Sequence, residues 1–221
     1  MNLPDHLLSL NWYVVGWVLF ALCLALALWR APWRRLADSA GLNLWLGNCV
    51  ILTLMWSMKA GVQPGLNFHL LGAMLMTLEF GPALALLGLV MVLLGVTLNG
   101  AVGWQAFGLN ALLMAVLPVA CSYGFWWLGN RWLPKNPFVF IFANGFFGSA
   151  FAIATTGLMA SWLLSSAGIY PFATLAEDYL PYFVLLGFSE AWLAGMVLTL
   201  MVVYRPAWLS TFDEHCYFAK R

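Results

Sequence analysis

The sequence predicts an all-α polytopic membrane protein with about seven transmembrane helices, the N-terminus outside and the C-terminus in the cytoplasm. Of its 221 residues, 64% are hydrophobic and 8% are charged, and the mean hydropathy is +0.90. Soluble domains carry about 45–50% apolar and about 25% charged residues, so a soluble globule of this size is excluded. The apolar residues form long continuous runs, which indicate helices and not the alternating segments of a β-barrel. The basic residues also gather on one side of the predicted membrane.

Seven apolar runs predict the spans. A spanning helix needs about 20 mostly apolar residues, and the candidate runs are 12–29, 41–58, 68–80, 82–98, 107–129, 138–167 and 179–204. The stretch 68–98 is too long for one span, and Gly81-Pro82 divides it because proline lacks an amide hydrogen and clashes with the preceding turn. We expect two short helices there, packed inside the bundle, and a long or kinked helix over 138–167. No soluble segment separates the runs, so residues 1–221 form a single transmembrane helical domain.

The basic residues set the expected orientation. With the N-terminus outside, eight of the nine lysines and arginines fall on the cytoplasmic side, with Lys59 as the exception: Arg30, Arg34, Arg35, Arg131, Lys135, Arg205, Lys220 and Arg221. Excess Lys and Arg in cytoplasmic loops is the usual pattern for spanning helices. We therefore expect a multi-pass protein of the bacterial inner membrane. The net charge of +1 gives no electrostatic reason to expect binding to nucleic acid.

Histidine is scarce, with only His6, His69 and His215 in the chain. In the predicted topology Asp5, His6 and His69 share the outer face, where Asn2 and Asn67 accompany them, whereas His215 lies in the cytoplasmic tail. Two imidazoles and a carboxylate suit a borderline metal ion such as nickel, cobalt, zinc or copper. A single histidine at a membrane interface is more often an interfacial polar residue, so spacing alone leaves both interpretations open.

Two acidic residues are expected within the spans. A carboxylate in a bilayer is expensive and normally faces the bundle interior, where it has a partner. Glu79 precedes the Gly-Pro break and is expected near the inner interface. Glu190 has no intramembrane lysine or arginine to pair with, so we expect an amide, hydroxyl or backbone partner. It would serve as a structural polar lock, or alternatively act on the ion path or in docking.

Nothing in the chain favours an enzyme. The sequence has no Walker A motif, so it cannot hydrolyse ATP itself. The segment GFSEA around Ser189 suggests an intramembrane serine protease, which would need a histidine at a similar depth. No GxSG-type motif is present, and His69 is expected at a different depth. The four cysteines are scattered without CxxC spacing and are expected to pack as small apolar residues.

Four segments in the same order resemble the CbiM/NikM family, the substrate-binding membrane subunits of cobalt and nickel energy-coupling-factor (ECF) transporters. The chain opens with MNLPDHLLS, continues with GLNFHLLGA followed by Gly81-Pro82, then has FGLNALLMA, and ends with GFSEAWLAGMVLTLMVVYRP. Each segment is modest alone, but the four extend in register over nearly the whole chain. The predicted seven-span topology is also that of the family.

The resemblance implies a metal site built on the N-terminus. In the family, the α-amine of the first residue, the backbone nitrogen and imidazole of the second, and the imidazole of the GHLLG histidine surround the ion. Carried over to this chain, Met1 donates its amine and His69 its imidazole. Residue 2 is Asn2, which has no imidazole but could still supply its backbone nitrogen or, as a hard and weak ligand, its amide oxygen. His6 stands where the family has glycine. Asn67, Asn110 and Glu190 are expected as supporting residues.

The departure at residue 2 leaves two hypotheses. In the first, Asp5 and His6 complete a His₂-carboxylate site with His69, a set that favours Zn(II) over square-planar Ni(II). In the second, the scaffold has lost the metal and acts as an accessory membrane protein or carries another small solute.

The predicted function is that of the substrate-binding (S component) permease subunit of an ECF-type ABC importer for a divalent transition-metal ion. The ion would be nickel or cobalt, with zinc as a further candidate, and it is transported and not held as a permanent cofactor. The resemblance implies a transmembrane coupling subunit and ATPase subunits as partners, and a small accessory membrane subunit is left open.

Overall fold

The structure is a computed structural model that describes residues 2–58 and 60–218. Met1, Lys59, Lys220 and Arg221 lie outside the described residues. The predicted amine ligand and three of the nine basic residues that set the expected orientation are therefore not placed.

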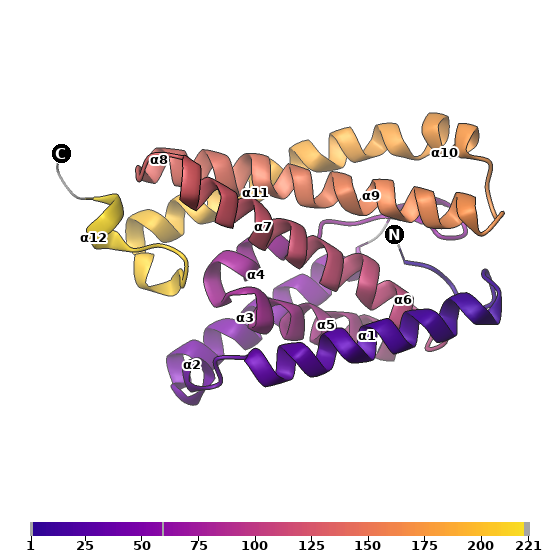
Figure 1. The fold of residues 1–221 in the computed structure, drawn as a ribbon, viewed down its shortest axis with the longest axis horizontal. Coiled ribbons are helices and arrows are strands. Elements are labelled where there is room, and N and C mark those ends of the chain that lie inside the picture. Colours follow the sequence, from indigo (N-terminus) through magenta and orange to yellow (C-terminus); the bar gives the residue numbers. More distant parts are fainter. Residues whose placement is uncertain (1, 59, 219–221) are drawn as a thin grey trace.

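The described chain is an elongated bundle of helices with one small hairpin (Figure 1). The elements are α1 (Leu10–Arg30), α2 (Arg34–Ala37), α3 (Ser39–Ser57), β1 (Ala60–Gln63), β2 (Leu66–Phe68), α4 (Ala73–Phe80), α5 (Pro82–Leu98), α6 (Phe107–Ala111), η1 (Leu112–Val116), α7 (Leu117–Trp132), α8 (Pro137–Phe140), η2 (Ile141–Gly148), α9 (Ser149–Ser166), α10 (Phe172–Asp178), α11 (Leu180–Tyr204), η3 (Pro206–Trp208) and α12 (Glu214–Tyr217).

Five helices among the described residues are long and apolar enough to cross a membrane: Leu10–Arg30, Ser39–Ser57, Phe107–Trp132, Pro137–Ser166 and Leu180–Tyr204. They correspond to the predicted spans outside the stretch 68–98. Helix α5 is apolar but has only 17 residues, and α4 has eight. The protein is therefore an all-α membrane protein. Between the second and third long helices, the chain forms the shorter helices α4 and α5 and not two full-length spans.

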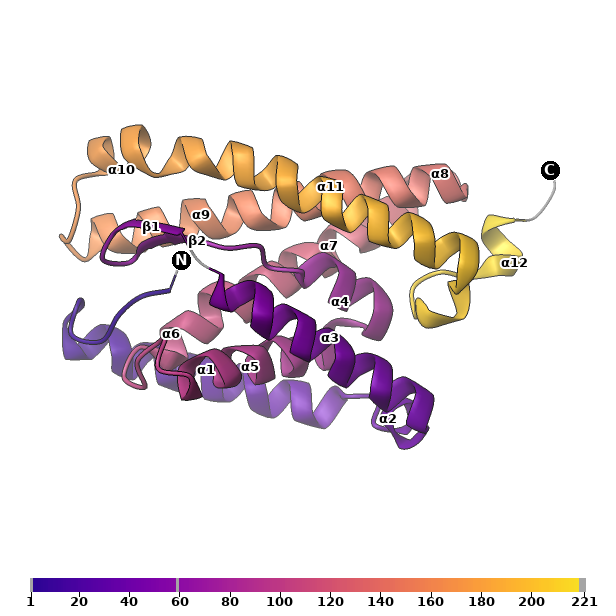
Figure 2. The ribbon, with the colours of Figure 1, turned by 180° about the vertical axis from the view of Figure 1, so that it is seen from behind.

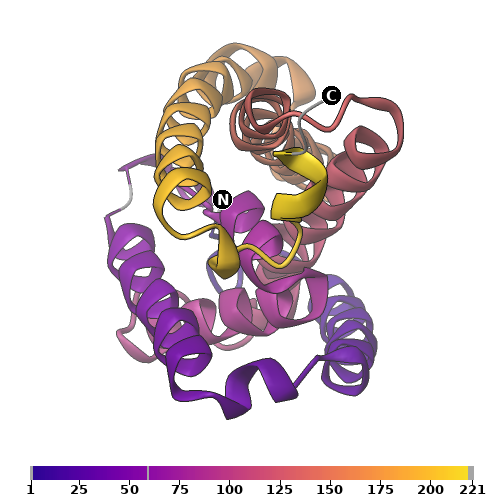
Figure 3. The same ribbon diagram turned by 90° about the vertical axis from the view of Figure 1, so that its left-hand side faces the viewer.

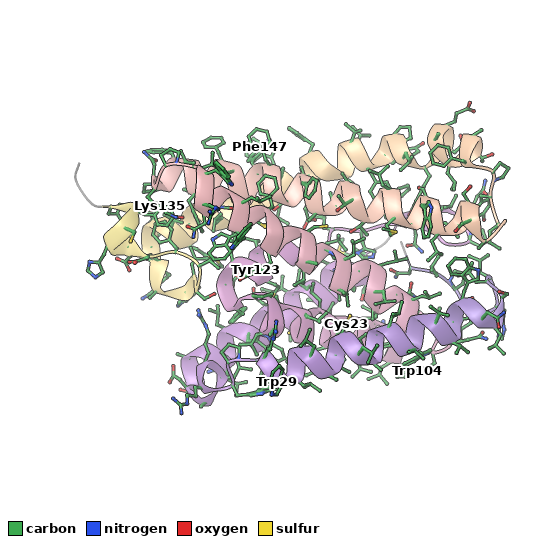
Figure 4. All side chains as sticks on the ribbon, in the orientation of Figure 1. Cys23, Trp29, Trp104, Tyr123, Lys135 and Phe147 are labelled. Carbon is green, nitrogen blue, oxygen red and sulfur yellow. The ribbon has the colours of Figure 1, made fainter. Side chains whose placement is uncertain are left out.

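The two ends of the bundle carry different segments (Figures 1 and 2). The β1–β2 hairpin and α10 lie toward one end, together with the start of α1, and α2, α8 and α12 lie at the other. Exposed Trp29 and Trp104 point away from the bundle, Trp29 near the end that carries α2 and Trp104 nearer the opposite end (Figure 4). This placement agrees with tryptophans at membrane interfaces.

Helix α4 begins at Ala73 and not at residue 68, because the preceding chain has another structure. Leu66–Phe68 pairs with Ala60–Gln63 in an antiparallel hairpin, with Ala60 opposite Phe68. Gly72 then adopts a left-handed conformation with φ of 70°, which glycine tolerates. Seen along the bundle, α4 and α5 lie between α9 and α11 on one side and α1 and α3 on the other (Figure 3).

The long predicted helix over 138–167 begins as α8, passes through the π-helical segment η2 and continues as α9. In η2, a Cβ atom on Gly145 would lie 3.1 Å from Cα of Gly195 in α11, so only a small residue permits this close approach. The small residue at Gly145 therefore serves internal packing.

Candidate functional site

The N-terminal segment before α1 is inserted among the helices and is not a free tail. Asn2 and Leu3 are 4% and 1% exposed. The phenol of Tyr13, in the first turn of α1, accepts from the Leu8 amide at 3.0 Å and donates to the Pro4 carbonyl at 3.0 Å. These bonds fold the segment back over the start of α1, so that its first residues point into the bundle.

Two asparagines fix the main chain of this segment. The Asn67 Oδ1 atom accepts from the Asn2 amide at 2.7 Å, and its Nδ2 atom donates to the Asn2 carbonyl at 3.1 Å. Asn110 binds Leu3 in the same two-point manner, at 2.8 Å and 2.9 Å. Each side-chain amide forms the two hydrogen bonds that an extended backbone would otherwise form with a neighbouring strand. The expected supporting residues Asn67 and Asn110 thus set the position of residue 2.

Asp5 is held away from Asn2 and Leu3, the buried residues of the N-terminal segment. Its Oδ1 atom accepts from the Ala106 amide at 2.8 Å, and its carboxylate lies so close to Gly103 that a Cβ atom there would overlap it. His6 is exposed, with φ of 63°, and its backbone amide donates to Gln105 Oε1 at 3.3 Å. Both residues contact the loop before α6.

His69 lies in the extended chain between β2 and α4 and is 3% exposed. Its Nδ1 atom is 3.0 Å from the Leu70 carbonyl oxygen. A carbonyl oxygen only accepts, so the bonding pattern assigns the proton to Nδ1 and leaves a lone pair on Nε2. The Trp56 ring packs on the imidazole with a centroid distance of 4.9 Å. Metal-binding histidines commonly donate their second ring N–H to a backbone carbonyl in this way.

The Nε2 atom of His69 faces Asn2 Oδ1 at 2.9 Å. With the proton on Nδ1, both facing atoms are acceptors, and the Asn2 Nδ2 atom is buried without a hydrogen-bond partner among the described residues. Two arrangements would resolve the conflict: rotation of the Asn2 amide, so that Nδ2 donates to His69 Nε2, or a cation bound by both acceptors. Metal–nitrogen and metal–oxygen bonds of about 2.0–2.2 Å place two ligand atoms at right angles about 2.9 Å apart. The pair therefore has the spacing of two neighbouring metal ligands.

The structure brings Asn2 and His69 together but does not gather Asp5, His6 and His69 into one group. No group of three or more His, Cys, Asp or Glu residues that could hold a metal ion occurs within residues 2–58 and 60–218. A His₂-carboxylate site therefore stays a prediction that would need Asp5 and His6 to leave their present partners. Sequence reasoning missed Trp56, Tyr13 and Gln105, for which the chain offers no local signal.

An open cleft of about 670 Å³ at the end of the bundle that carries the hairpin extends to Asn2, whereas His69 does not line it. It is lined by the N-terminal segment, the hairpin and the loop after α5, and Asn2, Asp5 and Asn67 contribute polar atoms to it. A hydrated ion can thus approach Asn2 without crossing the apolar core.

Glu79 and Glu190 are buried in the bundle, and each has a partner. Glu79 accepts from Asn48 Nδ2 at 2.5 Å. Glu190 accepts from the backbone amides of Leu71 and Gly72, which gives it the kind of partner expected from the sequence. Ser189, beside it, is exposed and bonds the carbonyl of Leu185 in its own helix. It therefore does not face His69.

The comparisons with known proteins agree with this architecture. The family described as "Cobalt uptake substrate-specific transmembrane region" (CbiM) matches residues 2–208. A crystal structure described as a truncated transition metal transporter superposes with a TM-score of 0.74 at 19% identity, covering 92% of this chain and 99% of the other. A second, described as a transition metal transporter, gives 0.72 at 19% identity, with coverages of 92% and 93%. No curated protein matches in the sequence search.

The two solved structures share the fold with this chain, and the family match extends over nearly all of the sequence. The predicted membership is confirmed: the chain belongs to the CbiM family of cobalt uptake substrate-specific transmembrane regions.

Proposed function

We propose that this protein is the substrate-binding subunit of an ECF-type importer and captures a divalent transition-metal ion, namely nickel, cobalt or zinc, from the outer face of the bacterial inner membrane. The observation that carries the proposal is the pair Asn2 Oδ1 and His69 Nε2, two facing acceptors 2.9 Å apart in a buried position. The Met1 amine that the resemblance implies would add a further nitrogen ligand.

The chemistry of this donor set supports a borderline ion. Imidazole nitrogen suits nickel, cobalt and zinc, whereas an amide oxygen is a harder donor that suits six-coordinate or tetrahedral ions better than square-planar nickel. Asp5 and His6 remain in the proposal as residues that fix the N-terminal segment to the loop before α6. They become ligands only if the segment rearranges when the ion binds.

The proposed topology has seven crossings with the N-terminus outside. The extended residues 69–72 together with α4 would form the third crossing, and α5 the fourth. The short helices are tolerable because most of α4 and α5 is buried against other helices, where protein and not lipid surrounds the backbone. Partner subunits would supply the energy, since the chain has no nucleotide-binding motif.

Metal binding by protein with its native N-terminus tests the proposal. Elemental analysis and competitive titration with nickel, cobalt and zinc would be performed on the wild type and on His69→Ala, Asn2→Ala and His6→Ala. His215→Ala serves as the matched control, because His215 is exposed in the tail. We expect one ion per chain, lost in His69→Ala, weakened in Asn2→Ala and retained in His215→Ala.

The His6→Ala result separates the two ligand hypotheses. Retained binding indicates the N-terminal set with Asn2, and lost binding indicates the His₂-carboxylate set. An added residue ahead of Met1 should weaken binding if the amine is a ligand. If the wild type binds none of the three ions, the metal proposal fails and the accessory-protein alternative takes its place.

A further inference from the structure

Glu190 is a buried carboxylate that the metal site does not use directly. It lies in α11 and is 4% exposed. Its Oε2 atom accepts from the Leu71 amide at 2.9 Å, and its Oε1 atom accepts from the Gly72 amide at 2.6 Å. The two bonds join residues 118 and 119 positions apart in the chain.

The need for this carboxylate follows from the depth at which α4 begins. A helix of eight residues is about 12 Å long, whereas the hydrocarbon core is about 30 Å thick. The last residues of α4 contact the tail, because Leu78 and Glu79 accept bonds from Thr211 and Ser210. The amides of Leu71 and Gly72, just before α4, therefore lie deep in the bundle, where unpaired amides are costly.

The carboxylate acts close to the imidazole of His69. Leu71 directly follows Leu70, whose carbonyl accepts from His69 Nδ1 at 3.0 Å. The two bonds from Glu190 fix the peptide planes at Leu71 and Gly72, where Gly72 has a left-handed conformation. A rotation of those peptide planes would turn the Leu70 carbonyl and break its hydrogen bond with the ring N–H of His69. That bond keeps Nε2 directed at Asn2.

We propose that Glu190 is a positioning residue for His69. From α11 it fixes the Leu71–Gly72 turn and, through the Leu70 carbonyl, holds the ring in the tautomer and orientation that present Nε2 to the ion. Where it concerns the ion, the inference rests on the proposed function. The state of the ring, however, is a property of the metal-free protein and can be measured separately.

Glu79 provides a matched control. It is also a buried glutamate, it lines the same cavity of about 170 Å³ as Glu190, and it belongs to α4. Its carboxylate bonds Asn48 near the other end of the helix. Substitution of either glutamate would therefore cause a general loss of packing or charge around α4. Only substitution of Glu190 would cause a change confined to His69.

The test uses ¹⁵N-histidine NMR on the metal-free protein together with metal titration of the same glutamate variants in chains that keep all three histidines. His6→Ala and His215→Ala leave His69 as the single histidine, so its ring signals are assigned directly. Glu190→Gln preserves size and can accept only one of the two amide bonds, so it is compared with Glu79→Gln and with Glu190→Ala. The signals of a protonated Nδ1 and an unprotonated Nε2 are the readout.

We expect the wild type and Glu79→Gln to show the Nδ1-protonated tautomer, and Glu190→Gln to show exchange between tautomers with about a 10- to 100-fold loss of metal affinity. Wild-type ring signals in Glu190→Gln, or equal changes in Glu190→Gln and Glu79→Gln, would overturn the inference. If no sample binds metal but Glu190→Gln alone alters the ring, the proposed function fails while the positioning role stands.

Discussion

Asn110 binds both main-chain polar groups of Leu3, accepting from its amide and donating to its carbonyl. The bond partners are separated by 107 positions in the sequence, and both residues are buried, at 0% and 1% exposure. The position of the start of the N-terminal segment therefore depends on a side chain of α6. A substitution of that side chain should alter the proposed metal site although Asn110 is not itself a proposed ligand.

Asn110→Asp is expected to weaken metal binding by about tenfold or more. The new carboxylate still accepts from the Leu3 amide, but its second oxygen faces the Leu3 carbonyl, and an unpaired buried acceptor costs about 1–3 kcal/mol. Competitive titration measures the loss. Asn99→Asp is the control, because Asn99 is exposed in the loop after α5. Equal affinities in the two variants would contradict the proposed part of Asn110.

Gly103→Ala is expected to displace Asp5. A Cβ atom at this position would overlap the Asp5 carboxylate, so the bond to the Ala106 amide must lengthen or break. A hydrogen bond to a charged group contributes about 1.5–3 kcal/mol, and thermal unfolding in detergent should show a corresponding loss. Gly47→Ala is the comparison, since a Cβ atom there meets nothing within 4 Å. An unchanged unfolding temperature in Gly103→Ala would refute this expectation.

Asn48→Leu is expected to destabilise the fold by leaving the Glu79 carboxylate without its 2.5 Å donor. Loss of one partner of a buried polar pair costs about 1–3 kcal/mol. The double variant with Glu79→Leu should recover part of this loss, because it removes the stranded carboxylate as well. Thermal unfolding of the two single variants and the double variant measures the coupling, and strict additivity would mean that the pair contributes nothing.

Labelling of Cys216 is expected to depend on Asp213. The thiol donates to Asp213 Oδ2 at 3.1 Å, and that hydrogen bond together with the negative charge raises the pKa of Cys216 above its usual range. The reactive thiolate is then scarcer at neutral pH, and it appears only as the pH rises through the raised pKa. In a variant without the other cysteines, Asp213→Asn should accelerate maleimide labelling at pH 7, and the difference should fade at high pH. Equal rates at pH 7 would contradict the assigned cause.

The same thiol reports the topology. With the proposed orientation, an impermeant maleimide should label Cys216 only in inverted membrane vesicles, and a cysteine introduced at His6 only in right-side-out vesicles. Labelling of both positions from one side would exclude an odd number of crossings.

Apolar length and the positions of proline were sufficient to place most helices from the sequence. The predicted run 82–98 coincides with α5 (Pro82–Leu98), and the run 179–204 lies within one residue of α11 (Leu180–Tyr204). The start of α4 was misplaced, since residues 68–72 are as apolar as a helix interior. Their extended form depends on pairing with Ala60–Gln63 and on Glu190, neither of which is local in sequence.

The candidate site, like the helices, was predictable from the sequence only in part. The scarcity of histidine drew attention to His69, and the resemblance placed residue 2 beside it, which is where Asn2 lies. Proximity in sequence suggested that Asp5 and His6 would join them. The left-handed backbone at His6 and the bond from Asp5 to Ala106 instead turn this part of the segment toward the loop before α6. No short-range pattern encodes that turn.

Helix α4 also has a consequence for biogenesis in the membrane. The two amides just before it depend on Glu190, and a carbonyl in its last turn depends on Ser210 and Thr211, all of which leave the ribosome well over 100 residues after it. During synthesis the segment therefore enters the bilayer without these hydrogen-bond partners, and the proposed site stays unformed until the hydrophobic run 179–204 has inserted. A stalled chain ending before residue 180 should accordingly contain His69 but lack a formed metal site.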